Sequence, residues 1–385
     1  MKSWLPVSGE PDHQYDGVWR VTFPRVKAWG GVLVNRITAA YAHRMAATIR
    51  DVARAAGVSP ATVSYYLNDT KPLTAETGRR IEKAMADLQF RRNPVARALA
   101  SRRSRIIALA YPFGAGHESY SARQFIVGAA RAAAALDYNL VVWPVDDDGL
   151  ELAKLAEQGL VDGVLLMDVR NDDPRVDALA KLGVPAALIG RTGDAVTLPY
   201  VDIDFDASVR LAADHLLDLG HRRIVLVNGD PEQGNLHGFG PYFRTEAAYR
   251  KLMGDWGLEP AVMICGQTVV DGRAAAGRLL ADFPDATAVI VMNELPAPGL
   301  TAELIQRGRS VPGDISVMSL YSTVNVAAMS TPNLTTVTTP GTELGALGVE
   351  ALLKHLGGFP VPPVLITGRL VIGASTGPQA GRRPA

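Results

Sequence analysis

Short apolar runs alternate with amphipathic segments through most of the chain from Arg105 onward, and this series occurs twice. The first series begins with RIIALAYP and ends with PAALIG, and the second begins near Ala207 with SVRLAADHLLDLGH and RRIVLVNGD. Apolar runs this short predict strands buried on both faces, which form parallel sheets when helices connect them. We therefore predict an α/β core over residues 105–375, built of two lobes of parallel sheet flanked by helices. The carboxyl ends of the strands should face a cleft between the lobes, where a small molecule would bind.

A glycine and a proline interrupt an otherwise helical stretch near the N-terminus, RDVARAAGVSPATVSYYLN. Inside a helix glycine costs about 1 kcal/mol and proline about 3 kcal/mol relative to alanine, so one helix should end at Gly57. A second helix should begin at Pro60, with Ser59 as its N-cap. Two short helices joined by a tight turn are typical of a helix-turn-helix reader of the DNA major groove. An ordinary helical corner in a globular core is the alternative.

A third helix is predicted over residues 77–88, with Thr74 as its N-cap. Its apolar residues recur at helical spacing and should be buried against the first two helices: Ile81, Ala84, Met85 and Leu88. The three helices together predict a compact headpiece over residues 47–91.

The net charge of zero hides an uneven distribution of charge along the chain. Residues 45–104 contain 11 Lys or Arg against 5 Asp or Glu, whereas the part from Arg105 onward contains 22 against 31. A basic excess that coincides with the helix-turn-helix indicates a surface for phosphates, although scatter of surface charge is the simpler alternative.

Three further segments complete the predicted organisation. Residues 1–46 lack sustained periodicity and a secretory signal, and we expect an extension without a fold of its own, with translation starting near Met45. A partly ordered arm is the alternative, because GGVLVNRI could form a short strand. Residues 92–104 contain Asn93 and Pro94, which can begin a helix too short to be stable without a partner. Residues 376–385 are expected to be a tail.

Several classes of protein are disfavoured. No apolar run reaches about 18 residues, so no segment is expected to span a membrane. The single Cys265 excludes an intramolecular disulfide, and no metal site or cofactor is predicted, which fits a cytoplasmic protein. No strand precedes a nucleotide-binding glycine motif, and His215 and His221 lack a nearby nucleophile, so we expect no catalytic residues and no enzyme activity. A transport-associated binding protein would share the two lobes but would need export.

Five segments in this order resemble the lactose-repressor (LacI/GalR) family of bacterial transcription factors: TIRDVARAAGVSPATVSYYLN, NPVARALA, HLLDLGHRRIVLV, VPGDISV and PNLTTV. The resemblance extends from Ala47 to about Gly377. It implies a headpiece, a hinge helix and a core similar to periplasmic sugar-binding proteins, with crossings between lobes near residues 202–205, 335–338 and 365–368. It also implies a homodimeric regulator, in the first place a repressor, that binds a palindromic double-stranded DNA operator and responds to a small-molecule effector such as a sugar.

The resemblance also implies which residues contact DNA. Tyr65 stands where many relatives have arginine, so the operator sequence does not carry over, because arginine and tyrosine read different base edges. Leu99 takes the place of the leucine that wedges into a central base step. The full set is Thr48, Ser59, Pro60, Ala61, Thr62, Ser64, Tyr65, Asn68, Thr74, Asn93, Ala96 and Leu99.

For the effector, the resemblance points to Arg244, Asn293 and Glu294. Arg244 matches an arginine that binds ligand hydroxyls, and Glu294 replaces the usual aspartate with a side chain one methylene longer. Residues 319–322 read Ser-Leu-Tyr-Ser in place of Gly-Phe-Asp-Asp, so two acids are lost. We expect Arg244 and Glu294 to point into the cleft, and a sugar, an atypical effector or none are the alternatives.

Overall fold

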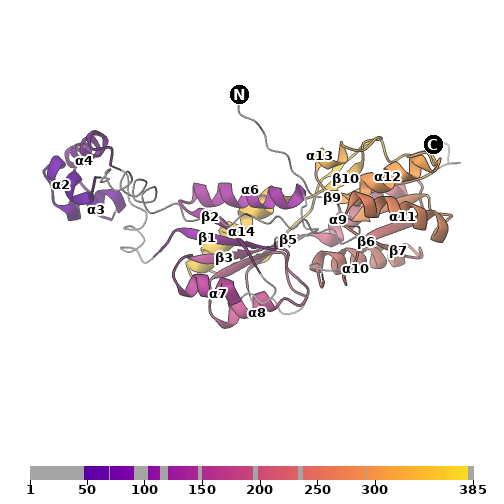
Figure 1. Ribbon diagram of the computed structural model, residues 1–385, viewed down its shortest axis with the longest axis horizontal. Coiled ribbons are helices and arrows are strands. Elements are labelled where there is room, and N and C mark those ends of the chain that lie inside the picture. The colour runs from indigo at the N-terminus through magenta and orange to yellow at the C-terminus, as the bar shows by residue number, and fades with distance from the viewer. Residues whose placement is uncertain are drawn as a thin grey trace, which may run out of the picture. The chain divides into compact units, whose positions relative to one another are not determined.

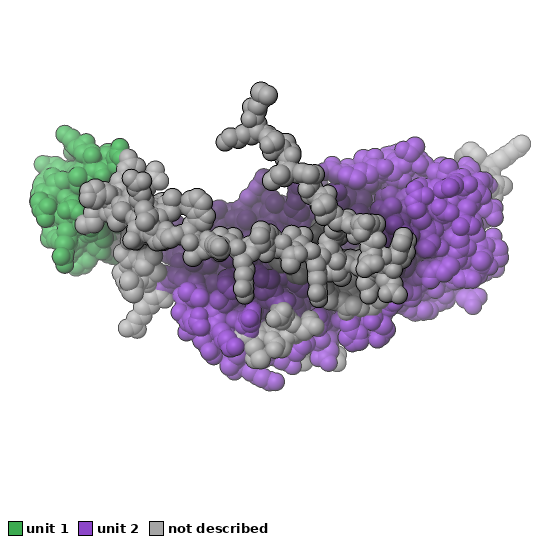
Figure 2. All heavy atoms as spheres, viewed as in Figure 1, with its two compact units in different colours: residues 1–93 green, residues 94–385 purple. Residues whose placement is uncertain are grey.

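The computed structural model describes residues 47–68, 70–90, 103–112, 120–145, 150–193, 198–232, 237–292 and 294–379. Two compact units divide the chain, residues 1–93 and residues 94–385 (Figure 2). Among the helices in these ranges, none is both long enough and apolar enough to cross a membrane.

The first unit contains the three predicted helices, α2 (Ile49–Ala56), α3 (Pro60–Asn68) and α4 (Ala75–Asp87). They bury one small core: Val52, Ala53, Ala56, Val63, Ile81 and Ala84. The third helix begins two residues earlier than expected, directly after its N-cap Thr74. The prediction that Leu88 is buried is wrong, because this residue follows the last turn of α4 and is 37% exposed.

The turn between α2 and α3 requires glycine. Gly57 ends α2 with φ of 63°, in the left-handed region, and its N–H donates to the carbonyls of Ala53 and Arg54. Arg80 on α4 donates from Nη2 to the carbonyl of Gly57 at 3.0 Å and also to that of Ala56. A side chain at position 57 would therefore be strained and would collide with Arg80. Arg80 thus ties α4 to the turn between α2 and α3.

The second unit contains two six-stranded sheets, coloured from purple to yellow in Figure 1. The first sheet is entirely parallel, in the order β11 (Val364–Ile366), β5 (Tyr200–Ile203), β4 (Ala186–Ile189), β3 (Gly163–Leu166), β1 (Ile106–Tyr111) and β2 (Asn139–Pro144). The second has the order β12 (Leu370–Val371), β10 (Thr335–Thr338), β9 (Ser316–Ser322), β8 (Ala288–Met292), β6 (Ile224–Gly229) and β7 (Ala261–Cys265). Only its edge strand β12 pairs antiparallel among these strands. The predicted pair of parallel sheets is confirmed.

Side chains alternate between the two faces along every strand, so both faces of each sheet carry apolar residues. Helices cover both of these faces. In β1, Ile107 and Leu109 join the core under α6 (Tyr120–Ala135) and α14 (Gly341–Leu356), whereas Ala108 and Ala110 join the core under α7 (Leu150–Glu157) and α8 (Pro174–Lys181). The second sheet lies between two further sets of helices. One contains α9 (Phe205–Asp218) and α10 (Gly240–Asp255), and the other α11 (Val269–Asp282) and α12 (Pro296–Gln306), with the short α13 (Val324–Ala327) nearby.

The chain crosses between the lobes three times, at the places that the resemblance implied. It passes from β5 into α9, from β10 into α14, and from β11 into β12. The first lobe is therefore discontinuous, since α14 and β11 return to it after the second lobe has been built. Helices α6 and α14 approach closely, and a Cβ at Gly345 would overlap the carbonyl oxygen of Phe125.

The residues expected to form a tail from 376 belong to the second lobe as far as the described residues extend. His215 Nε2 lies 2.9 Å from Thr376 Oγ1, and His221 Nε2 lies 3.0 Å from the carbonyl oxygen of Gly377. Gln379 donates its N–H to the carbonyl of Leu219 at 2.9 Å. The core therefore extends at least to Gln379 rather than to 375, and the two histidines hold its end.

Candidate functional site

Helix α3 presents the side chains that were expected to meet base edges. Pro60 and Ala61 are exposed and Tyr65 is half-buried, while Val63 on the opposite face is fully buried in the headpiece core. The Tyr65 ring also lies under Lys71, whose Nζ is 4.7 Å from the ring centroid. The outward face of α3 is therefore available to a partner, with a cation beside its aromatic residue.

Three residues expected to contact phosphates cap the three helices. Thr48 Oγ1 accepts the N–H of Asp51 at 3.3 Å, Ser59 Oγ accepts that of Thr62 at 3.1 Å, and Thr74 Oγ1 accepts that of Thr77 at 3.3 Å. Caps place these hydroxyls beside exposed backbone N–H groups, where the helix dipole favours an anion. Of the other expected DNA contacts, Thr62 and Ser64 are half-buried on α3.

Some expected site residues lie outside the described part of the chain. The hinge residues are among them, as is one effector residue: Asn93, Ala96, Leu99 and Asn293. Asn68 ends α3, but its side chain is not described. The roles of these residues in binding DNA or the effector stay predictions.

A cleft of about 1070 Å³, counting the part open to solvent, lies between the two lobes of the second unit. Residues from both lobes line it, and six of them are aromatic: Tyr111, Phe125, Phe205, Phe239, Tyr242 and Tyr321. Asp168 follows β3 with φ of 52° and Tyr321 lies in β9 with φ of 55°, so both hold a backbone conformation that is uncommon for residues with a side chain. Such strain collects at ligand sites.

Glu294 lines this cleft as expected, but it also joins the two lobes. It is only 3% exposed and comes from the loop after β8 in the second lobe. Its Oε1 accepts the N–H of Ser121, at the start of α6 in the first lobe, at 2.9 Å. Its Oε2 accepts the N–H of Thr323 in the second lobe at 3.4 Å. The carboxylate is therefore a direct link across the cleft.

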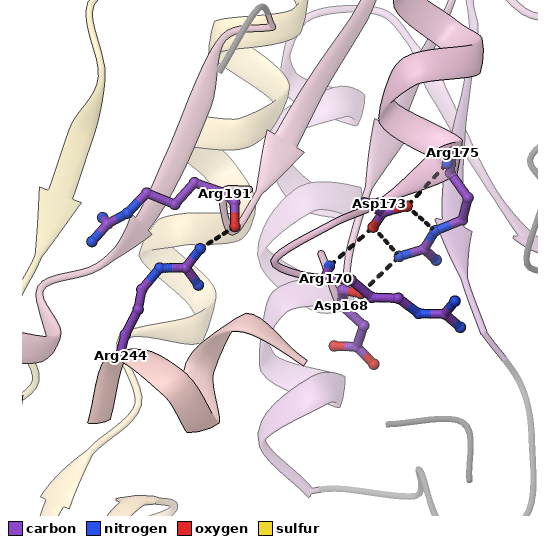
Figure 3. A network of polar contacts seen from close by, with 6 residues as sticks. All are labelled: Asp168, Arg170, Asp173, Arg175, Arg191 and Arg244. Carbon is purple, nitrogen blue, oxygen red and sulfur yellow. Dashed lines mark hydrogen bonds and ion pairs between the residues drawn. The ribbon is translucent and has the colours of Figure 1, made fainter. Parts of the chain in front are cut away.

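Arg244 places its guanidinium carbon 5.9 Å from the ring centroid of Phe205, which lines the cleft, and its expected contact with an effector stays a prediction. Its Nη2 donates to the carbonyl of Arg191, and also to that of Thr192 at 3.2 Å (Figure 3). Burial lowers the pKa of Arg244, and the carboxylate of Asp202 opposes that effect. Because Arg244 begins on α10 and its acceptors follow β4, the guanidinium is a second link between the lobes.

Sequence reasoning missed Asp202, which lines the cleft at the end of β5 and is 4% exposed. Burial raises its pKa to about 6, although Arg244 and Arg191 lower it. The Nη1 of Arg191 lies 3.5 Å from Asp202 Oδ2. No sequence signal identifies this cluster, since its members come from α10, β5 and the loop after β4.

A buried ion pair shapes the loop that carries Asp168. Arg175 donates from Nε and Nη2 to the two carboxylate oxygens of Asp173, at 2.9 Å and 2.7 Å, and from Nη2 to the carbonyl of Asp168 at 2.7 Å (Figure 3). The pair is buried, and hydrogen bonds from Arg170 and Arg175 outweigh burial, so the pKa of Asp173 is lowered. The sequence signal is Asp173 before Pro174, which begins α8.

Two family models match the chain. The model of bacterial regulatory proteins of the lacI family matches residues 48–93, and that of a periplasmic binding protein-like domain matches residues 213–376. Among curated relatives, the HTH-type transcriptional regulator MalR of Streptomyces coelicolor is 31% identical over 353 residues, covering 88% of this chain and 99% of its own length. The HTH-type transcriptional regulator AglR of Rhizobium meliloti is 30% identical over 355 residues, covering 88% and 97%.

Solved structures agree. The lac repressor dimer bound to operator and the anti-inducer ONPF has a TM-score of 0.72 and 27% identity, covering 86% of this chain and 99% of that one. A complex of the transcriptional regulator CelR with cellobiose has a TM-score of 0.64 and 26% identity, with the same coverage.

Proposed function

The chain belongs to the LacI family of DNA-binding transcriptional regulators, and from this premise we propose that it is an operator-binding repressor controlled by a small molecule. The observation that carries the proposal is the exposed face of α3 in a capped three-helix headpiece. Such a helix fits the major groove, where side chains distinguish base pairs. A regulatory role in the cytoplasm, rather than catalysis, agrees with the family.

We assign the parts of the chain as follows. Residues 47–91 bind DNA, and residues 92–104 form a hinge whose Leu99 wedges between bases. The core from residue 105 binds the effector and pairs two chains into a homodimer, as the lac repressor dimer on its operator suggests. Two paired headpieces would read a palindrome.

The effector is proposed to occupy the cleft at the carboxyl ends of the strands, as the cellobiose complex of CelR suggests. Because the same cleft separates two lobes, a ligand that favours one separation also favours one spacing of the hinges. Operator and effector must then change each other's affinity by the same factor.

The DNA-binding proposal is tested by selecting an operator from a random duplex pool with the full chain. Tyr65→Ala should then weaken binding to the selected duplex by about tenfold and broaden the sequences recovered, because one specific base contact is worth about 1–3 kcal/mol. Ala86→Ser, an exposed change on α4, is the matched control and should leave affinity unchanged. Failure of the wild-type chain to enrich any sequence would refute the proposal.

The effector proposal is tested with the same operator. Sugars, sugar phosphates, nucleosides and amines are screened by thermal shift, and each hit is titrated into the operator complex. A hit should change operator affinity and gain or lose affinity itself by the same factor when operator is present. A ligand that fills the cleft without changing operator affinity would contradict it.

A further inference from the structure

Every charged side chain among the described residues that line the cleft is acidic: Asp168, Asp202 and Glu294. Arg244 and Arg191 lie near Asp202 and lower its pKa, which burial raises. Arg244 turns its guanidinium to backbone carbonyls of the first lobe, and Arg191 places Nη1 beside Asp202. Beside Glu294, an incoming anion would meet a carboxylate in a partly desolvated space, where like charges repel strongly.

Glu294 differs from the other two acids because it occupies a place that favours anions. The N–H of Ser121 points out of the first turn of α6, a helix of 16 residues, and a helix start attracts negative charge. The Glu294 carboxylate already accepts that N–H at 2.9 Å, together with the N–H of Thr323 at 3.4 Å. It is also a buried charged group with hydrogen bonds to both lobes, so it is held in position.

We propose that Glu294 determines the ligand class of the cleft, because its carboxylate fills the position to which an anionic group would bind. The effector then lacks phosphate and carboxylate groups, and its uncharged or cationic polar groups meet the acids while its apolar part contacts the aromatic residues. This inference rests on the proposed role of the cleft as the effector site. An aspartate at this position would be one methylene shorter and would reach less far towards Ser121.

The test measures binding of an anion to the full chain, and the cleft of the wild type should not bind it. Inorganic phosphate is titrated into the wild-type protein and into Glu294→Ala, and melting is followed by circular dichroism. Removing the carboxylate should open the position at α6, so phosphate should raise the Tm of the variant by about 3 °C more than that of wild type. Binding of phosphate by the basic headpiece is common to both proteins and cancels in the difference.

Glu350→Ala is the matched control. It removes the same charge from an exposed position on α14, where Glu350 Oε2 lies 4.0 Å from Lys354 Nζ, and it should respond to phosphate as wild type does. Glu294→Ser decides the question if the alanine variant does not fold, because it shortens the side chain and removes its charge while keeping a polar group. Hydrogen exchange of the peptide covering residues 120–126 should slow on phosphate addition in the Glu294 variants alone.

Equal phosphate responses in wild type, Glu350→Ala and the folded Glu294 variants would overturn the inference. So would a wild-type ligand that carries a phosphate and slows exchange of the peptide 120–126. Neither measurement involves DNA, so this inference can fail while effector control of operator binding holds. Conversely, phosphate binding gained by the variants would stand even if no ligand changed operator affinity.

Discussion

The titration of Asp202 makes the stability of the core depend on pH. Burial raises its folded pKa to about 6 from 3.8, so the folded protein binds a proton that the unfolded chain has released between these values. The free energy of unfolding should therefore fall as pH rises from about 4 to about 6. The fall attributable to this group should be about 2 kcal/mol.

Asp202→Asn should remove that part of the pH dependence, because the amide does not titrate and can still accept the N–H of Ile203. The measurement is the urea midpoint of the core at several pH values between 4 and 7, for both proteins. A constant difference between wild type and variant across this range would show that Asp202 does not titrate there.

At the scale of single residues, local chemistry was predictable and long-range contacts were not. The cap Ser59, the left-handed Gly57 and the cap Thr74 follow from a few neighbouring residues, and the structure has them in those roles. Arg244 shows the limit, because its acceptors lie more than 50 residues away along the chain. Only the tertiary fold decides which way such a side chain turns.

Helices α6 and α14 show how a pair of elements depends on one missing side chain. Gly345→Ala would place a Cβ against the Phe125 carbonyl, so the helices must separate, at a cost of about 3 kcal/mol. Gly254→Ala on α10 meets nothing within 4 Å and should instead stabilise by about 0.5–1 kcal/mol. Thermal unfolding of the two variants should move in opposite directions, and a neutral Gly345→Ala would mean that the helices pack less tightly.

Among the elements, long periodic segments were predictable and the short crossing strands were not. The runs that form β1, β6 and β8 are continuous and apolar, so their burial fixes them as strands. Strands β11 and β12 have three and two residues, and no periodicity can be read from segments this short. The resemblance to the LacI family located the crossing near residues 365–368, which the hydrophobic pattern could not locate.

For the whole molecule, the separation of a basic headpiece from an acidic core predicts that operator affinity depends strongly on salt concentration. Operator affinity should fall by about 10³-fold or more between 50 and 200 mM salt, because phosphate contacts release counterions. Arg50→Gln, at an exposed position of α2, should make the slope of log affinity against log salt shallower by about two in a homodimer. Arg309→Gln, exposed on the core, should leave the slope unchanged, and equal slopes for all three proteins would argue against Arg50 as a phosphate contact.

The discontinuity of the first lobe has a consequence for the order in which the molecule is made. A ribosome completes β6 to β10 of the second lobe by residue 338, but the first lobe lacks α14 and β11 until residue 366 has been added. During that interval α6 is present on this face of the first sheet, but the part that α14 covers, with Leu165 and Ile189, lacks that helix. The first lobe is thus still incomplete when the parallel strands of the second lobe have been made, and a nascent chain paused before residue 341 is the form of this protein that most needs a chaperone.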